Sequence, residues 1–230
     1  MPYTGQKQAA SPQPIQRGKS LKTQVYEFLR ESFLSGSLKS DQLSEANIAA
    51  RLGVSRTPVR EALLELRREG LLSYSPRGGA ELPKLLPEDV HHLCQLRILL
   101  EGFACAELAG RLSPEATRQL RRRIGEMQQA VRRKAWAQLL RADREFHASL
   151  AGATGNRFLA ETVGRLFDRL IVAGIEAAFT RARQQEALAE HEHLLDALVA
   201  GDGRLAADIM RQHLHISSTY LAAPGQETPL

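Results

Sequence analysis

The fold of this chain is decided by the stretch Leu52-Gly53-Val54-Ser55-Arg56-Thr57-Pro58-Val59-Arg60-Glu61-Ala62-Leu63. Gly53 supplies a tight turn, and the hydroxyl of Ser55 can accept a backbone N–H at the start of a helix. Pro58 falls in the first turn of that helix, where a missing N–H costs nothing. The stretch therefore predicts the turn and the second helix of a helix-turn-helix.

The two faces of this second helix differ in character. The apolar stripe at helical spacing consists of Val59, Ala62, Leu63 and Leu66. Arg56, Thr57 and Arg60 point away from the stripe at the N-terminal end, where a recognition helix presents side chains to base edges and phosphates. An ordinary surface helix with a few arginines is the alternative.

The flanking sequence extends this motif to a winged helix-turn-helix. Helices are expected from about Leu21 to Leu34 and from Ser44 to Leu52, and the recognition helix should end near Glu69. Residues 71–74 and 80–82 read as two short strands around Pro76-Arg77-Gly78-Gly79. In such a wing Arg77 and Gly78 approach phosphates or the minor groove, although a plain tight turn is the alternative for the glycines.

Charge and composition favour a polyanion as partner. Residues 1–84 hold 13 Lys and Arg against 8 Asp and Glu, whereas residues 85–230 hold 18 of each. No apolar run approaches the ~20 residues that a membrane span needs, and the N-terminus lacks a signal-peptide core. We therefore expect a cytoplasmic protein without a membrane partner.

The chain is expected to be mainly α-helical and to contain two domains. We predict a disordered tail (1–18), a winged helix-turn-helix (19–82), a short stiff linker with two prolines (83–87), a helical domain (88–221) and a frayed tail (222–230). The helices of the second domain are expected near 88–110, 114–133, 135–151, 157–179, 183–200 and 204–221. Asn156 reads as the N-cap of the fourth of these.

Four polar residues interrupt the apolar faces of the helical domain. Asp143 and His147 are four residues apart and share one helix face with apolar neighbours, where an unpaired charge is costly. The remaining pairs are His191/His193 and His213/His215, and residues two apart point about 200° apart on a helix. The neighbours of His191 and His213 are apolar, so these two should face inward.

The same two histidines lie ten residues before Gly201 and ten residues after Gly203. In an antiparallel helix hairpin both are then about 15 Å from the turn, at the same height. One carboxylate and three neutral imidazoles suit a divalent transition metal: Zn²⁺, Ni²⁺, Mn²⁺ or Fe²⁺, with Zn²⁺ expected in the isolated protein. Buried histidines without a metal are the alternative.

Arg97 and the two cysteines lie in the first helix of the same domain. The guanidinium of Arg97 has mostly apolar neighbours and could bind a ligand carboxylate, or it could pair with Glu101 four residues on. Cys94 and Cys105 are too far apart along one helix, about 16 Å, to form a disulfide, so we expect buried thiols.

The helix-turn-helix stretch, with Glu69-Gly70-Leu71 and Pro76-Arg77-Gly78, resembles the DNA-binding domain of GntR-type bacterial transcription regulators. The helical half, with Asp143-x-x-x-His147, Glu190-His191 and Met210-Arg211-x-His213, resembles the FCD domain of the FadR-like branch. The resemblance implies a homodimer that binds a palindromic operator in double-stranded DNA. It also implies a metal held beside a small organic-acid effector.

Position by position, the resemblance assigns roles to individual residues. It implies DNA contacts from Ser55, Arg56, Thr57, Arg60 and Gly78. It implies metal ligation by Asp143, His147, His191 and His213, and, more loosely, effector binding by Arg97. The chain departs from the family at Ser40-Asp41, where Pro-Gly is usual, and at Ala46 and Asn47, of which Asn47 is kept as a candidate DNA contact.

Three functions are compared. An effector-responsive transcription regulator fits both halves of the sequence and is the function that we expect. A DNA-binding dimer with a purely structural metal is the second. A metalloenzyme is disfavoured, because no free Glu or His is obviously placed as a general base beside the candidate ligands. The sequence also lacks a convincing pair of the Glu-x-x-His motifs that di-iron bundles use. The sequence leaves open the effector, the metal in vivo, the operator, and whether the protein represses or activates.

Overall fold

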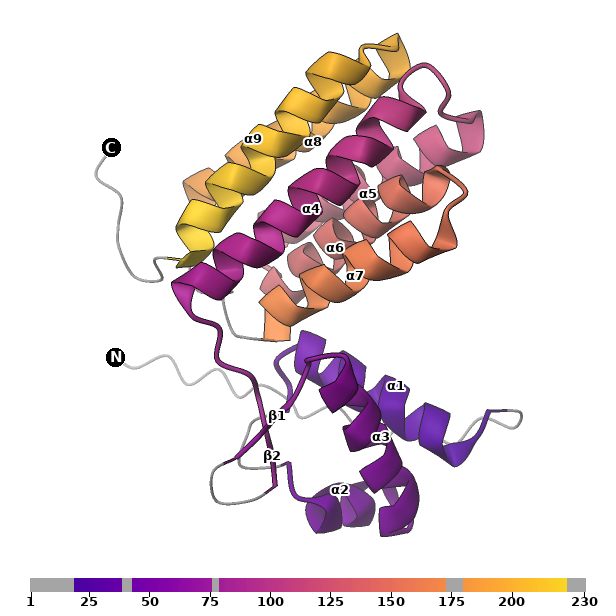
Figure 1. The fold of residues 1–230 in the computed structure, drawn as a ribbon, viewed down its shortest axis with the longest axis vertical. Coiled ribbons are helices and arrows are strands. Elements are labelled where there is room, and N and C mark those ends of the chain that lie inside the picture. Colours follow the sequence, from indigo (N-terminus) through magenta and orange to yellow (C-terminus); the bar gives the residue numbers. More distant parts are fainter. Residues whose placement is uncertain (1–18, 39–42, 76–78, 173–179, 223–230) are drawn as a thin grey trace. The chain divides into compact units, whose positions relative to one another are not determined.

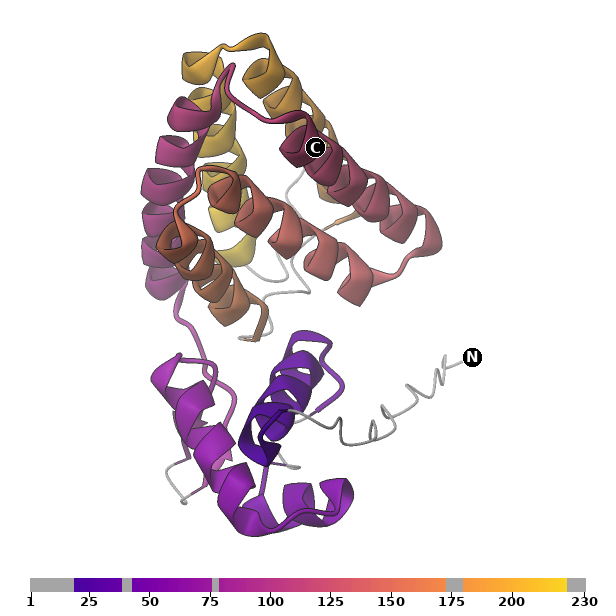
Figure 2. The ribbon, with the colours of Figure 1, turned by 90° about the vertical axis from the view of Figure 1, so that its right-hand side faces the viewer.

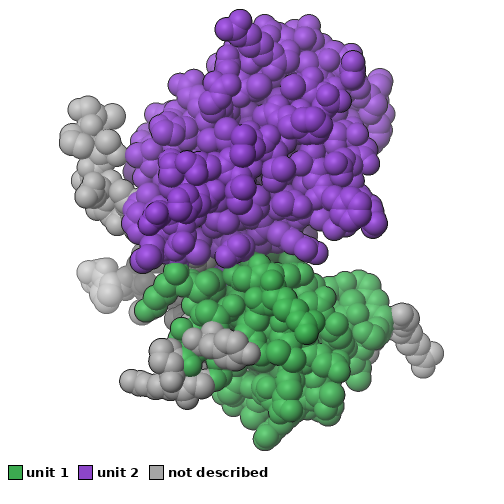
Figure 3. Space-filling view, in the orientation of Figure 1, with its two compact units in different colours: residues 1–84 green, residues 85–230 purple. Residues whose placement is uncertain are grey.

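The computed structural model describes residues 19–38, 43–75, 79–172 and 180–222. The chain divides into two compact units, residues 1–84 and residues 85–230 (Figure 3). The division falls within the proline-containing stretch of the sequence, and Pro87 is already the first residue of a helix.

The described residues of unit 1 form three helices and a two-stranded antiparallel sheet. They are α1 (Leu21–Leu34), α2 (Glu45–Leu52), α3 (Arg56–Arg68), β1 (Ser73–Tyr74) and β2 (Ala80–Glu81) (Figure 1). The strands are shorter than expected, because Leu71 and Leu72 are buried in the core ahead of the pairing rather than within it. The expected wing tip, Arg77 and Gly78, lies outside the described residues.

The turn between α2 and α3 has the conformation that the sequence predicts. Gly53 ends α2 with a φ of 65°, a left-handed conformation that a side chain disfavours. Ser55 is the N-cap residue of α3, but its side chain makes no capping hydrogen bond, so the expected role of its hydroxyl is wrong. The predicted apolar stripe is buried: Val59, Ala62, Leu63 and Leu66.

Unit 2 is a bundle of helices. They are α4 (Pro87–Leu108), α5 (Pro114–Arg133), α6 (Trp136–Ala153), α7 (Arg157–Val172), α8 (Arg181–Ala200) and α9 (Gly203–Ala222) (Figure 1). Helix α4 packs along α9, α5 along α6 and α8, and α6 along α7 (Figures 1 and 2). The predicted helix 157–179 is described only as far as Val172, and residues 173–179 lie outside the described part.

Local signals place these helices as the sequence predicts. The side chain of Asn156 accepts hydrogen bonds from the backbone N–H groups of Phe158 and Leu159, which makes it the N-terminal cap of α7. Cys94 and Cys105 are buried free thiols on α4. None of the helices that the structure describes has the length and apolar character that a membrane crossing requires.

Candidate metal centre

Helix α6 supplies two of the four candidate ligands from one face. Asp143 and His147 are one helical turn apart, and His147 is fully buried while the side chain of Asp143 is 23% exposed. Phe146 and Leu150, which neighbour them, lie in the core of unit 2. The carboxylate therefore sits at the edge of an apolar interior and the imidazole sits inside it.

Helices α8 and α9 supply the other two candidates. His191 and His213 are buried, whereas His193 and His215 are exposed, so the prediction of which histidines face inward is confirmed. The two helices pack against each other on either side of the turn at Gly201, whose φ of 83° allows the sharp reversal.

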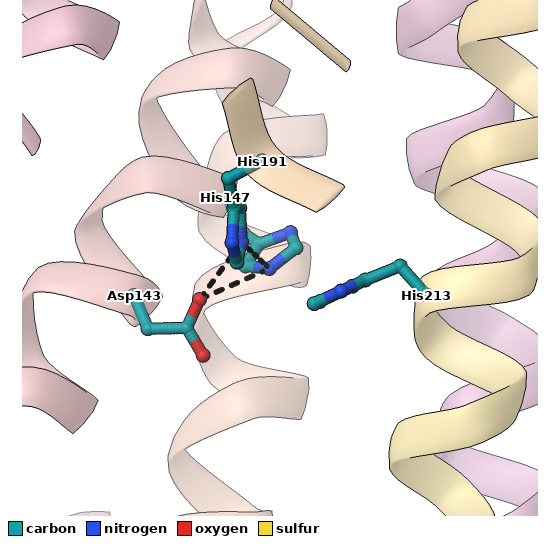
Figure 4. A group of neighbouring side chains, drawn as sticks. All are labelled: Asp143, His147, His191 and His213. Atoms are coloured by element: carbon teal, nitrogen blue, oxygen red, sulfur yellow. Dashed lines mark hydrogen bonds and ion pairs between the residues drawn. The ribbon is translucent and has the colours of Figure 1, made fainter. Parts of the chain in front are cut away.

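The structure brings these four residues together. Each of Asp143, His147, His191 and His213 offers one donor atom, and the four atoms lie within 4.8 Å of one another. Figure 4 shows the ring of His213 pointing from α9 toward the other three side chains. Helix α6 and the consecutive helices α8 and α9 thus contribute to one cluster.

The outward nitrogen of every imidazole is anchored by a hydrogen-bond acceptor. Nδ1 of His191 lies 2.6 Å from the carbonyl oxygen of Ala187, and Nδ1 of His213 lies 2.6 Å from Oε2 of Glu190. Nδ1 of His147 contacts Oε2 of Glu101. Because carbonyl and carboxylate oxygens only accept, each Nδ1 carries the proton and donates it outward, and a neutral ring then presents the lone pair of Nε2 inward.

The centre of the cluster is therefore rich in lone pairs. Oδ1 of Asp143 lies 3.0 Å from Nε2 of His191 and 3.4 Å from Nε2 of His147, and those two Nε2 atoms lie 3.3 Å apart. Among the described residues Oδ1 of Asp143 has no partner with hydrogen-bond geometry. A cation satisfies such a set of buried acceptors, so the donor chemistry fits a divalent transition metal.

Electrostatics at the cluster favour positive charge in its centre. Burial opposes ionisation of Asp143, but the neighbouring imidazoles of His147 and His191 hold its pKa well below the usual range. Burial lowers the pKa of His147, yet the charge of Glu101 and the contact with Asp143 raise it above the ordinary value. Burial lowers the pKa of His213 to about 4, which keeps its ring neutral near pH 7.

Arg97 makes the internal ion pair that was considered for it. Its Nε donates to Oε1 of Glu101 at 2.7 Å, and both side chains are buried. Its guanidinium carbon lies 4.4 Å from the centre of the Phe167 ring, and its Nη2 has no hydrogen-bond partner among the described residues. Nη2 of this buried guanidinium can therefore still donate to a ligand, and Glu101 alone separates Arg97 from His147.

A second arginine repeats this arrangement on the other side of the cluster. Arg183 is buried at the start of α8, and its two terminal nitrogens donate to the carboxylate oxygens of Glu190 at 2.6 and 2.8 Å. Glu190 in turn accepts from His213. Two chains of the form Arg–Glu–His therefore lead to the centre, Arg97–Glu101–His147 and Arg183–Glu190–His213.

The sequence indicated the pair of Arg97 and Glu101, but not the contact of Glu101 with His147 and not the second chain through Arg183 and Glu190. Glu101 had a usable signal, because Arg97 and Glu101 interrupt an otherwise apolar face of α4 at i and i+4. Glu190 entered the sequence analysis only as part of the motif Glu190-His191, without a role of its own, and Arg183 had no distinguishing neighbour pattern. Their contacts join α8 to α9, so spacing within one helix could not indicate them.

The candidate DNA contacts of unit 1 lie on its surface. Asn47, Ser55, Arg56, Thr57 and Arg60 are all exposed, at the start of α2 and at the N-terminal end of α3. The guanidinium of Arg60 binds the carboxylate of Glu45 through Nε and Nη2, with distances of 2.9 to 3.2 Å. Glu45 on α2 thus fixes the orientation of the Arg60 guanidinium near the N-terminal end of α3.

Comparison with known proteins identifies both units. Residues 21–82 match the gntR family of bacterial regulatory proteins, and residues 92–215, more than half of the chain, match the FCD domain. The chain belongs to the gntR family. It is a DNA-binding transcription regulator with a C-terminal FCD domain, and this family places it among regulators and not among enzymes.

Relatives of this regulator match along most of their length. The transcriptional regulator McbR of Escherichia coli K12 is 29% identical over 86% of this chain and 92% of its own. A solved E. coli McbR/YncC structure superposes with a TM-score of 0.77, at 27% identity over 88% of this chain and 97% of that one. A regulator of Streptomyces ambofaciens is 30% identical over 86% of this chain and 83% of its own. The probable D-xylose utilization operon transcriptional repressor of Paenarthrobacter nicotinovorans is 29% identical over 87% of both chains.

Proposed function

We propose that this regulator senses a small organic acid through a divalent metal held by Asp143, His147, His191 and His213. The observation that carries the proposal is the convergence of three Nε2 lone pairs and one carboxylate oxygen inside unit 2. The protein ligands number four, so a metal that accepts five or six ligands has room for a carboxylate oxygen of the effector.

Arg97 supplies the second contact of the proposed effector. Its Nη2 is buried without a hydrogen-bond partner among the described residues, and an unsatisfied buried donor is costly. A carboxylate placed between the metal and this guanidinium would satisfy both. The pair with Glu101 stays in place, because it uses Nε and leaves Nη2 available.

Unit 1 is proposed to bind a palindromic operator as part of a homodimer. The exposed groups at the N-terminal end of α3 are Ser55, Arg56, Thr57 and Arg60, and Asn47 lies nearby on α2. Arg77 and Gly78 are proposed to contact the DNA from the wing. The Paenarthrobacter relative is named as a probable transcriptional repressor, and we propose that this regulator also represses.

Effector binding must favour one arrangement of the dimer to change operator affinity. The operator for the test is first selected by the protein from a pool of random DNA duplexes, so that no operator sequence has to be taken from a relative. Binding to this operator is then followed by fluorescence anisotropy. Operator affinity is measured at fixed salt with Zn²⁺ present, across a panel of small mono- and dicarboxylates. At least one acid is expected to change the affinity by about 5- to 150-fold.

Two variants on α8 make the test specific. His191→Ala removes a proposed ligand, while His193→Ala is the matched control, since His193 is exposed on the same helix. The acid should act on the wild type and on the control but not on His191→Ala. If the protein binds metal and no acid changes operator affinity, the ion is structural and the sensor proposal is overturned.

A further inference from the structure

The interior of unit 2 holds a second buried cation besides Arg97. Arg183 is fully buried, and its Nη1 and Nη2 donate to the carboxylate of Glu190. Its Nε, however, is buried without a hydrogen-bond partner among the described residues. An unsatisfied buried donor costs free energy, and the contacts of the proposed effector described so far supply no acceptor for it. Nε of Arg183 is therefore available to donate to a ligand.

This Nε lies on the edge of the guanidinium that faces Ser217. In a guanidinium, the N–H of Nε and one N–H of Nη2 point outward from the same edge in a fixed fork. Nη2 of Arg183 lies 3.4 Å from Oγ of Ser217, which is buried on α9. A hydroxyl that accepts a hydrogen bond still has its own proton to donate. An oxygen atom of a ligand at this edge can therefore contact both Nε of Arg183 and the hydroxyl of Ser217.

Ser217 lies one helical turn beyond the candidate ligand His213 on the same face of α9. Four residues of helix correspond to about 6 Å along the helix axis. A chain of about four carbons spans this distance, because a C–C bond is about 1.5 Å long. A short acid whose carboxylate is bound at the metal centre therefore reaches Ser217 and Arg183 with its other end.

The charges around the cluster favour an effector with a single carboxylate. Two guanidinium groups and three carboxylates lie buried or half-buried there: Arg97, Arg183, Glu101, Asp143 and Glu190. With neutral imidazoles, a divalent cation changes the net charge of this set from negative to a single positive charge. One carboxylate neutralises that charge, whereas a second would leave a net negative charge in the interior, which is costly. The group that reaches Ser217 should therefore be neutral.

We propose that the effector is a short monocarboxylate with a distal hydroxyl group, which Arg183 and Ser217 recognise. The inference rests on the proposed function and specifies the class of acid that the sensor binds. The metal and Arg97 hold the carboxylate, and Nε of Arg183 donates to the distal oxygen. A hydroxyl suits this position, because it accepts from Nε and also donates to Oγ of Ser217.

Calorimetric titration of the zinc-loaded, full-length protein tests the class of acid. The probes are butanoate, its terminal hydroxy acid and succinate, with matched sets that are one carbon shorter and longer. At the best-fitting length, the hydroxy acid should bind about tenfold or more tighter than the plain acid, as for a hydrogen bond to a charged donor, and tighter than the dicarboxylate. Equal binding of the hydroxy and plain acids, or tightest binding of the dicarboxylate, would overturn this inference and leave the proposed sensor standing. If none of the acids binds, the sensor and this inference both fail.

Variants of two neighbouring serines on α9 test the recognising residues. Ser217→Ala should lower the preference for the hydroxy acid over the plain acid by about three- to tenfold, with unchanged zinc content and unchanged affinity for the plain acid. Ser218→Ala is the matched control, because Ser218 is also buried but its Oγ lies 3.4 Å from Nδ1 of His91 on α4. Arg183→Lys keeps the charge beside Glu190 without an Nε–H and should lose most of the preference, while circular dichroism shows that the protein remains helical. A preference that neither Ser217→Ala nor Arg183→Lys lowers below that of Ser218→Ala would overturn the assignment.

Discussion

The outward hydrogen bonds of three imidazoles decide the chemistry of the candidate metal centre. A histidine whose Nδ1 donates to an oxygen must offer Nε2 as a lone pair while the ring is neutral. His147, His191 and His213 all do so, and two of the three acceptors are carboxylates. Carboxylate partners also raise the basicity of the ring, which strengthens a metal bond. Glu101 and Glu190 therefore belong to the candidate metal centre together with the four candidate ligands.

Glu190→Gln should lower the metal affinity of the protein by about 10- to 100-fold, the range for loss of an outer carboxylate partner. The amide keeps the shape of the side chain but weakens the hold on Nδ1 of His213. Competition with a fluorescent chelator measures the affinity. Glu192→Gln is the control, because Glu192 is exposed on the same helix. Equal affinities for the two variants would contradict the role of Glu190.

Glu101 should make the metal-free protein sensitive to acid. Burial raises the pKa of this carboxyl, but the charges of Arg97 and His147 outweigh burial and lower it from 4.5 to about 2. A lowered carboxyl pKa adds stability that is present above pH 4.5 and is lost as the pH falls toward 2. Urea unfolding of the wild type between pH 5 and pH 3 should show this loss.

The matching variant is Glu101→Gln. Its lower baseline stability reflects the unpaired Arg97, so the slope with pH is the quantity to compare. The slope should be shallower than that of the wild type over the same range. Identical slopes would show that Glu101 does not titrate as the structure indicates.

The sequence predicted that Asp143, His147, His191 and His213 converge, and it named the pair of Arg97 and Glu101, but it did not indicate how Glu101 and Glu190 contact the histidines. Asp143 and His147 follow from one-turn spacing, and His191 and His213 follow from the apolar character of their neighbours. Arg183 and Glu190 could not be found in this way, because their interaction joins residues seven apart and reaches His213 on another helix. Only tertiary packing shows such a chain.

At the scale of elements, α2 and α3 cooperate in presenting the DNA-binding side chains. Arg60 on α3 donates hydrogen bonds to the carboxylate of Glu45 on α2, and these hydrogen bonds are the main reason why the pKa of Glu45 is lowered. A planar guanidinium held in this way is oriented for one approach to the DNA. We therefore expect the pair of Glu45 and Arg60 to influence both the affinity and the specificity of the operator complex.

Glu45→Gln should separate these two effects. Removing a negative charge beside the phosphates raises nonspecific DNA affinity, and the slope of log affinity against log salt should steepen by about one. Loss of the orienting carboxylate should reduce the ratio of specific to nonspecific affinity. Titrations at several salt concentrations with operator and scrambled duplexes measure both. An unchanged ratio would show that Arg60 needs no support from Glu45.

Gly53 sets the turn between the same two helices. Gly53→Ala should destabilise unit 1 by about 1 kcal/mol, because its φ of 65° disfavours a side chain while no atom obstructs one. Gly125→Ala is the opposite control: Gly125 lies inside α5 with open space, so alanine should stabilise by roughly 0.5 to 1 kcal/mol. Denaturant midpoints provide the readout, and a neutral Gly53→Ala would contradict the strain argument.

The elements themselves were largely predictable. Helix α1 has the expected bounds, since Ser20 caps its start and its apolar spacing ends near Gly36. The start of α8 at Arg181 and the short strands were less accessible. The start of α8 is set by the capping hydroxyl of Thr180, and no apolar periodicity in the sequence supports that start. The length of the strands depends on how Leu71 and Leu72 are buried in the core.

At the scale of the molecule, a basic DNA-binding unit and a charge-balanced helical unit lie on one chain. Family membership and the surplus of Lys and Arg in residues 1–84 agree on the partner of the first unit. The charge balance of residues 85–230 gives no such indication, and the function proposed for unit 2 depends on Asp143, His147, His191 and His213. The proposed sensor is therefore decided by whether those side chains bind an ion.

Metal content of the purified full-length protein is the most direct measurement of that point. Elemental analysis after gel filtration should find one divalent transition metal per chain in the wild type and in His193→Ala. It should find none in His191→Ala or in Asp143→Ala, with circular dichroism showing that both variants remain helical. Metal retained at full stoichiometry in both ligand variants, or a wild type that binds no ion when zinc is supplied, would contradict the account.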